Sequence, residues 1–299
     1  MANFKIEEGY MPFMGYNTYY RIVGEKVDGK GPLLLLHGGP GSTHNYFELL
    51  DSLAATGRQV ISYDQLGCGK SYVEGHPELW TAETWINELK SLIDYLHLDN
   101  VHLLGQSWGG MLAIKYLIDE KAEHISTAIL SSTLSDSQLW GREQHRLITF
   151  MSEADQEAIA RAEATGNYND ADYLAANERF MLLHCAAAPT EESAECLRRK
   201  KRAGTEAYVT AWGPNEYTPE GNLSDYYYTD RLNEINIPCM IMSGTNDLCT
   251  PLVAKTMYDG IRDAEWHLFD GARHMCFAEQ NEKYCRLLAD FMSKHEQTL

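Results

Sequence analysis

The stretch from 101 to 110 constrains this chain more than any other, because a short apolar run there ends in Gly-x-Ser-x-Gly and a helical pattern follows. This order predicts a strand, a sharp turn and a helix. The strained turn requires small flanking residues, Gly105 and Gly109, and it leaves the Ser107 hydroxyl exposed at a helix N-terminus. Backbone N–H groups at such a terminus stabilise the oxyanion formed when an alcohol attacks a carbonyl. Ser107 is therefore predicted to be a nucleophile.

A glycine-rich loop follows an earlier strand. The run 33–36 is four leucines, typical of a strand buried on both faces, and it leads into His37-Gly38-Gly39-Pro40-Gly41. Such a loop lets the backbone approach a ligand closely. We expect Gly38 to lie at the substrate, and the N–H groups of Gly39 and Trp108 to form an oxyanion hole. His37 is expected to hold this loop by hydrogen bonds.

A serine hydroxyl needs an adjacent base, which is oriented in turn by a carboxylate. Asp247 follows the predicted strand 237–244, and His274 follows the predicted strand 264–269. Parallel strands place such loops at one sheet edge, where open α/β sheets build their sites. The order Ser107, Asp247, His274 is that of the α/β hydrolases. We therefore predict a serine hydrolase with these three residues as its catalytic triad.

Strand and helix patterns alternate along most of the chain and predict an α/β-hydrolase fold, with a mostly parallel sheet flanked by helices. Residues 4–23 alternate as a hairpin would. Residues 136–232 are helical and polar instead, and a helical block cannot extend a sheet. We expect an inserted helical cap there, between core segments 1–135 and 233–299. Its predicted helices span 138–152, 154–164, 173–185 and 193–212.

Composition narrows the function further. The chain carries 25 basic and 43 acidic residues, a formal net charge of −18, which disfavours nucleic acid and anionic membranes as partners. Seven scattered cysteines without C-x-x-C pairs, and an N-terminus without an apolar leader, predict reduced thiols in a cytoplasmic protein. Residues 69–71, Gly-Lys-Ser, end like a phosphate loop, but the first glycine of that motif would fall at position 64, which is Asp. The histidines lack metal-ligand spacing. No metal or cofactor is predicted, and the oligomeric state is open.

Four motifs together resemble the proline iminopeptidase family of α/β hydrolases, nearest to its tricorn-interacting and lactobacillar branch. They are the segments 37–41, 64–71, 105–110 and 212–216, which read HGGPG, DQLGCGKS, GQSWGG and WGPNE. The resemblance implies release of an N-terminal residue, often proline, from short peptides, amino-acid amides or arylamides. It also implies that Glu216 binds the substrate's amino group.

One position departs from that pattern. In the tricorn-interacting relatives a second glutamate follows the triad aspartate, whereas this chain has Leu248, which we expect to face the acyl group. Losing one of two carboxylates weakens ammonium binding by about 1–3 kcal/mol if the pair is desolvated. An esterase or amidase for small uncharged acyl groups is therefore an alternative. A catalytically silent scaffold that acts as a binding module is another, which the intact triad disfavours.

Overall fold

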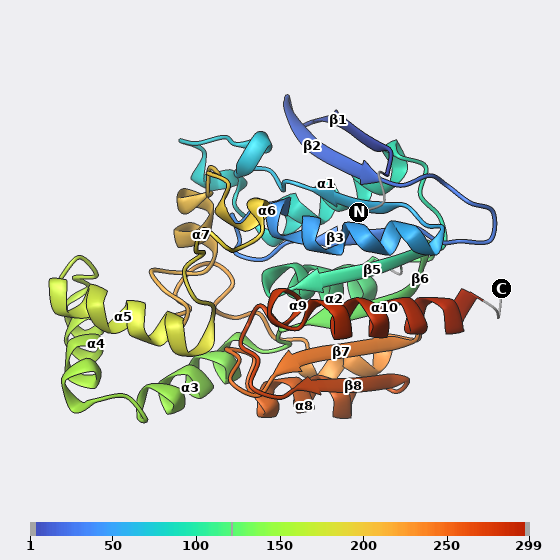
Figure 1. The fold of residues 1–299 in the computed structure, drawn as a ribbon. Helices are drawn as coiled ribbons and strands as arrows, with labels where there is room; N and C mark the ends of the chain where they lie inside the picture. Colours follow the sequence, from blue (N-terminus) through green and yellow to red (C-terminus); the bar gives the residue numbers. More distant parts are fainter. Residues whose placement is uncertain (1–3, 121, 297–299) are drawn as a thin grey trace.

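The computed structural model describes residues 4–120 and 122–296, and it has an eight-stranded sheet at its centre (Figure 1). The sheet order is β1-β2-β4-β3-β5-β6-β7-β8. The pairs β1–β2 and β2–β4 are antiparallel, and the remaining neighbours are parallel. The strands are β1 (Ile6–Phe13), β2 (Tyr16–Val23), β3 (Leu33–Leu36), β4 (Val60–Tyr63), β5 (Val101–Gln106), β6 (Ile125–Ser131), β7 (Cys239–Gly244) and β8 (Ala264–Phe269).

Helices cover both faces of this sheet, and a further group of helices lies beyond the carboxyl ends of its strands. The helices of the core are α1 (Ala82–Tyr95), α2 (Trp108–Asp119), α8 (Pro251–Gly260), α9 (Cys276–Glu279) and α10 (Asn281–Glu296), with the 3₁₀ segments η1 (His44–Thr56), η2 (Gly69–Ser71), η3 (Pro77–Leu79) and η4 (Thr229–Glu234). Between β6 and β7 lie α3 (Ser137–Ile148), α4 (Glu153–Thr165), α5 (Ala171–His184), α6 (Glu195–Arg198) and α7 (Thr205–Ala211). In Figure 1, α3 to α7 lie beyond the arrowheads of β5 and β7. The predicted domain boundaries at 136 and 232 stay predictions.

The leucine run shows why both faces of the sheet are covered. Leu34 and Leu36 pack in the cluster that includes the apolar faces of α1 and α2. Leu33 and Leu35 point the other way and pack with η1 and α10. Side chains alternate along a strand, so an unbroken apolar run requires apolar cover on both sides. The strand predicted here and the hairpin predicted over 4–23 are both confirmed.

The prediction of one continuous helix over 193–212 is wrong. The chain forms only the short helices α6 and α7 there, with an irregular segment between them. Gly204, which ends this segment, donates its N–H to the Gly41 carbonyl at 2.8 Å. A Cβ on Gly41 would lie 2.4 Å from the Gly204 carbonyl oxygen, so the two backbones are in close contact. This contact between distant segments replaces the helical hydrogen bonds that local periodicity predicts.

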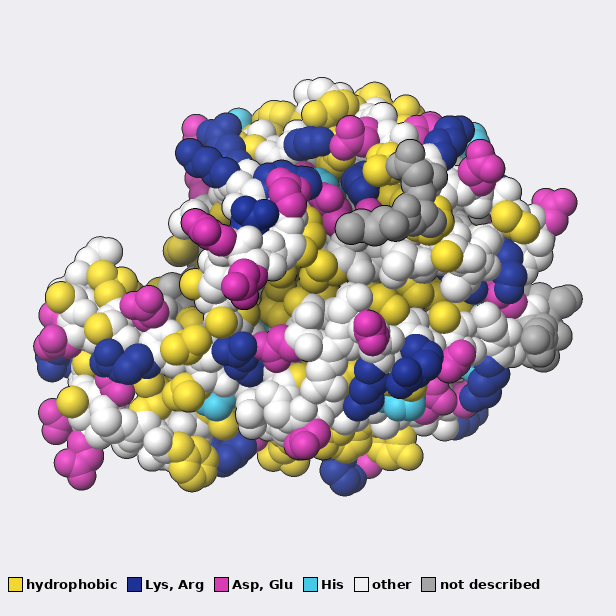
Figure 2. Space-filling view, viewed as in Figure 1, with side chains coloured by type: hydrophobic (Ala, Val, Ile, Leu, Met, Phe, Trp, Pro, Cys, Tyr) yellow, Lys and Arg dark blue, Asp and Glu magenta, His cyan; other side chains and the backbone are white. Residues whose placement is uncertain are grey.

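Charges of both signs are interspersed on the face shown in Figure 2. Within the described ranges, 4–120 and 122–296, no helix has the length and apolar character needed to cross a membrane.

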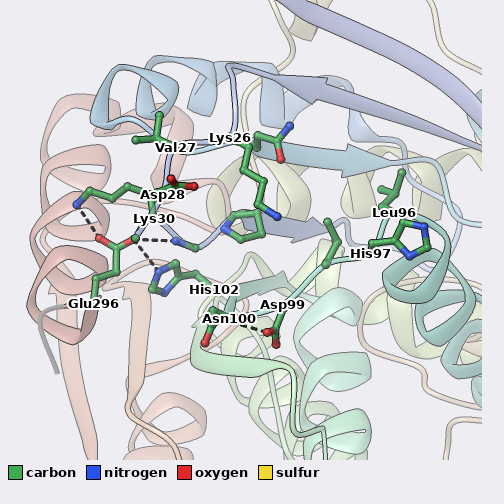
Figure 3. A pocket seen from close by; sticks show the side chains of 15 residues that line it. Lys26, Val27, Asp28, Lys30, Leu96, His97, Asp99, Asn100, His102 and Glu296 are labelled. Carbon is green, nitrogen blue, oxygen red and sulfur yellow. Dashed lines mark hydrogen bonds and ion pairs between the residues drawn. The ribbon is translucent and has the colours of Figure 1, made fainter. Parts of the chain in front are cut away.

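A cavity of about 460 Å³ lies at the amino-terminal edge of the parallel strands, and Glu296 at the end of α10 is one of the residues that line it (Figure 3). Glu296 accepts hydrogen bonds from Arg58 Nη1 at 2.7 Å, Lys30 Nζ at 2.8 Å and the Gly31 N–H at 3.1 Å. The Arg58 side chain is 0% exposed, so its positive charge is balanced by the Glu296 carboxylate and not by water. Removing one member of a buried ion pair leaves the other charge uncompensated.

Replacing Glu296 with glutamine is therefore expected to lower the free energy of unfolding at pH 7 by about 3 kcal/mol. Urea unfolding measures this, and Glu282→Gln, on the exposed side of α10, is the control with an expected change below about 0.5 kcal/mol. Burial raises the pKa of Glu296, but hydrogen bonds from Lys30 and Arg58 outweigh it and hold the pKa below its ordinary value. The stabilisation is thus present above the ordinary carboxyl pKa and is lost as pH falls through the lower, folded-state value. Equal midpoints for both variants at pH 7 would contradict this role.

Candidate active site

Ser107 occupies a strained turn between β5 and α2. Its φ of 55° and ψ of −125° are unusual for a residue with a side chain. A Cβ on Gly105 would lie 2.2 Å from the Gly109 carbonyl oxygen, and one on Gly109 would lie 2.0 Å from the Leu36 carbonyl oxygen. Both flanking positions therefore require glycine, as the motif predicts. Ser107 is only 9% exposed, less than expected, because the loop at Gly38 packs against it.

The Asp247 carboxylate accepts four hydrogen bonds. One oxygen accepts from His274 Nδ1 at 2.7 Å and from the Cys249 N–H at 2.8 Å. The other accepts from Ser132 Oγ at 2.6 Å and from the Gly244 N–H at 3.1 Å. Asp247 and His274 are 1% and 5% exposed. The carboxylate is thus fixed in place and orients the imidazole, while Ser132 is a positioning residue that the sequence analysis missed.

The strand register brings the three predicted triad residues to one edge of the sheet. Gln106 pairs with Ser131 across β5 and β6, and Gly244 pairs with Phe269 across β7 and β8. Ser107, Asp247 and His274 each follow the carboxyl end of one of these strands. Gln106 Nε2 also donates to the His274 carbonyl at 3.5 Å, which links the serine turn to the histidine loop. The hydrogen bond between the Ser107 hydroxyl and His274 Nε2 stays a prediction.

The glycine loop packs directly on the serine turn. The Gly38 N–H donates to Tyr46 Oη at 2.6 Å, and Tyr46 Oη donates to Gln106 Oε1 at 2.9 Å. A Cβ on Gly38 would lie 3.0 Å from Ser107 Cβ, so a side chain there would displace the turn. Gly39 has a φ of 115°, which favours glycine.

Trp108 is the first residue of α2, so its N–H has no acceptor within that helix. On the loop side, Gly39 directly follows Gly38, whose backbone lies against the serine turn. The joint function of the Trp108 and Gly39 N–H groups as an oxyanion hole stays a prediction.

His37 holds the loop in the way the sequence predicts. Its Nδ1 bonds the Gly38 carbonyl at 2.9 Å, and its Nε2 accepts from the Gln65 N–H at 3.0 Å. Burial lowers the pKa of His37 to about 4, so the ring is neutral near pH 7. His37 lies with Asp64 and Cys68 in a buried group of metal-ligating residue types. The hydrogen bonds of His37 use both ring nitrogens for loop structure.

A cavity of about 430 Å³ is lined by both Gly39 and Glu216. The Glu216 carboxylate accepts from Tyr208 Oη at 2.8 Å. Burial raises the pKa of Glu216, while the charge of nearby His274 and the bond from Tyr208 act in the opposite direction. Trp140 Nε1 donates to the Glu216 carbonyl at 2.8 Å, and the Trp140 ring lies 5.9 Å from the His274 ring. Glu216 is thus a half-buried carboxylate near the histidine, and no lysine or arginine among residues 4–120 and 122–296 forms an ion pair with it.

Leu248 directly follows Asp247 and is fully buried in the apolar core, at 0% exposure. Its carbonyl accepts from Gln144 Nε2 at 2.7 Å, which ties the triad loop to α3. Contact between this side chain and the acyl group of a substrate stays a prediction.

Fold and site together define a hydrolase of the α/β class. The family model described as the alpha/beta hydrolase fold matches residues 31–280, so the chain belongs to this family. Within it, the chain is 58% identical over 292 residues to a proline iminopeptidase of Clostridioides difficile, covering 98% of this chain and 100% of the relative. It is 59% identical over 295 residues to the proline iminopeptidase of Lactobacillus helveticus, with the same two coverages.

A solved structure agrees with these relatives. The crystal structure of a proline iminopeptidase from Mycobacterium smegmatis superposes with a TM-score of 0.86 at 28% identity, covering 98% of this chain and 99% of that one. The fold class, the hydrolase class and the resemblance to proline iminopeptidases that the motifs predict are therefore confirmed.

Proposed function

We propose that this enzyme releases the N-terminal residue, proline foremost, from short peptides, amino-acid amides and arylamides. Ser107 attacks the carbonyl of the first residue while His274 accepts its proton and Asp247 orients the imidazole. The N–H groups of Gly39 and Trp108 stabilise the oxyanion. His274 then protonates the leaving amine, and water hydrolyses the acyl-enzyme with the same base.

Recognition of a free amino terminus is assigned to Glu216. One observation carries this assignment: the Glu216 carboxylate and the loop residue Gly39 line the same cavity. A carboxylate that is partly withdrawn from water is stabilised by a paired cation, and a substrate ammonium supplies that cation. The raised pKa of Glu216, caused mainly by burial, agrees with a carboxylate that awaits its partner.

A proline arylamide and its N-acetylated form test this assignment. Wild-type enzyme is expected to cleave the free compound at least about 100-fold faster in kcat/KM, because acetylation removes the charge that Glu216 binds. Glu216→Gln is expected to lower kcat/KM for the free compound by about 10- to 100-fold, mainly through KM. Glu220→Gln, an exposed glutamate of the same segment, is the matched control. Equal or faster cleavage of the blocked compound by wild type would rule out amino-terminus recognition.

Leu248 favours one alternative, an esterase or amidase for small uncharged acyl groups, because an apolar residue stands at the position of the second glutamate. Short-chain nitrophenyl esters in the same kinetic panel distinguish the two functions. The esterase proposal requires that these esters react far faster than any aminoacyl arylamide.

The enzyme is further proposed to act in the cytoplasm on short peptides. All seven cysteines are free thiols, five of them buried, which suits a reducing compartment.

A further inference from the structure

Two neighbouring cavities share one lysine. Lys201 lines the cavity of Gly39 and Glu216, and it also lines a second cavity of about 360 Å³. Arg273 and Met275, on either side of His274 in the sequence, line the second cavity. Lys201 belongs to the irregular segment that replaces the predicted helix over 193–212.

The ammonium group of Lys201 has no ion-pair partner among residues 4–120 and 122–296. Lys201 is an exposed residue, yet partial desolvation of its ammonium group lowers its pKa, and only longer-range charges, among them that of Asp64, oppose this. Asp64 is already engaged, since it accepts from the His44 N–H and the Lys70 N–H, each at 2.8 Å. The Lys201 ammonium otherwise lies 5.8 Å from the centre of the Tyr46 ring, a contact of modest strength.

The other cation of the second cavity is neutralised. Arg273 Nη2 pairs with Glu279 at 2.6 Å, and its Nη1 donates to the Leu182 carbonyl at 2.6 Å. Glu216, in the first cavity, is not within ion-pair distance of Lys201. Among the described residues that line these two cavities, Glu216 is the one carboxylate and Lys201 the one ammonium group without an ion-pair partner.

We infer that Lys201 binds the terminal carboxylate of a short peptide substrate and thereby sets a preference for dipeptides and tripeptides. The inference rests on the proposed function, in which Glu216 binds the amino group and His274 protonates the leaving amine. The leaving residue must then lie on the His274 side, and Arg273 and Met275, the sequence neighbours of His274, line the second cavity. One or two residues beyond the scissile bond span only about 3–7 Å. A zwitterionic peptide of that length carries one charge for each of these two residues, an ammonium group for Glu216 and a carboxylate for Lys201.

The test compares prolyl-alanine with prolyl-alaninamide, which lacks the carboxylate. Wild type is expected to favour the free acid about tenfold in kcat/KM, mainly through KM, because a charge-assisted bond in the ground state is lost with the amide. In Lys201→Met this ratio is expected to fall to about one. Lys201→Arg keeps the positive charge and should retain most of the preference. Lys200→Met, at the neighbouring lysine, which is not among the lining residues of either cavity, should retain the wild-type ratio.

A wild-type ratio near one, or an unaltered ratio in Lys201→Met, would overturn the role of Lys201. A proline arylamide, which has no carboxylate, separates this result from failure of the proposed function. If wild type cleaves the arylamide but shows no preference for the free acid, only the role of Lys201 is lost. If wild type cleaves none of the three compounds, the proposed function is lost with it.

Discussion

Replacing Ser107 with alanine is expected to lower kcat for a proline arylamide by about 10⁶-fold. The alanine removes the only atom that can form the acyl-enzyme, and the base and the oxyanion donors cannot act without it. The substitution removes a single oxygen, and the backbone N–H of residue 107 keeps its hydrogen bond to the Ser131 carbonyl. We therefore expect the variant to fold.

A fluorophosphonate probe gives a second readout of the same residue. It should label wild type and fail to label Ser107→Ala, while Ser91→Ala, a serine on α1 that bonds the Asn87 carbonyl, should be labelled normally. Absence of labelling in folded wild type would instead support the silent-scaffold alternative. Labelling of Ser107→Ala at the wild-type rate would show that another residue is the nucleophile.

Replacing Asp247 with asparagine is expected to lower kcat by about 10⁴-fold. The carboxylate accepts four hydrogen bonds, two on each oxygen, whereas an amide has one oxygen and one NH₂ group. An NH₂ facing His274 Nδ1 would require that nitrogen to accept a bond. The proton would then sit on Nε2, where it prevents the ring from acting as a base towards Ser107.

Steady-state kinetics on a proline arylamide measure this loss, and thermal unfolding shows that the variant is folded at the assay temperature. Asp270→Asn is the matched control, because Asp270 is an exposed aspartate directly after β8. Its kcat should stay within about twofold of wild type. If Asp247→Asn kept more than a tenth of the wild-type kcat, a different carboxylate would have to orient His274.

The neighbours of these residues show how far sequence patterns reach. Ser132 directly follows β6 and bonds Asp247, so the rule that parallel strands place their following loops at one edge would have indicated it. Tyr46 supports the glycine loop from within η1, and Lys201 lies in an irregular segment. Neither has a local signature, because both act through contacts with segments far away in the chain.

The sequence by itself determined the serine turn, the doubly buried strand of leucines, the order of the three polar groups and the family. These features are local, since glycine sterics and side-chain periodicity act over a few residues. Only the tertiary structure decided that Glu216 shares a cavity with Gly39, that the chain over 193–212 does not form one continuous helix, and that Lys201 lines this cavity and a second one with Arg273 and Met275. Such placements depend on how distant loops pack on one another, as the contact between Gly41 and Gly204 does, and no short-range pattern encodes that packing.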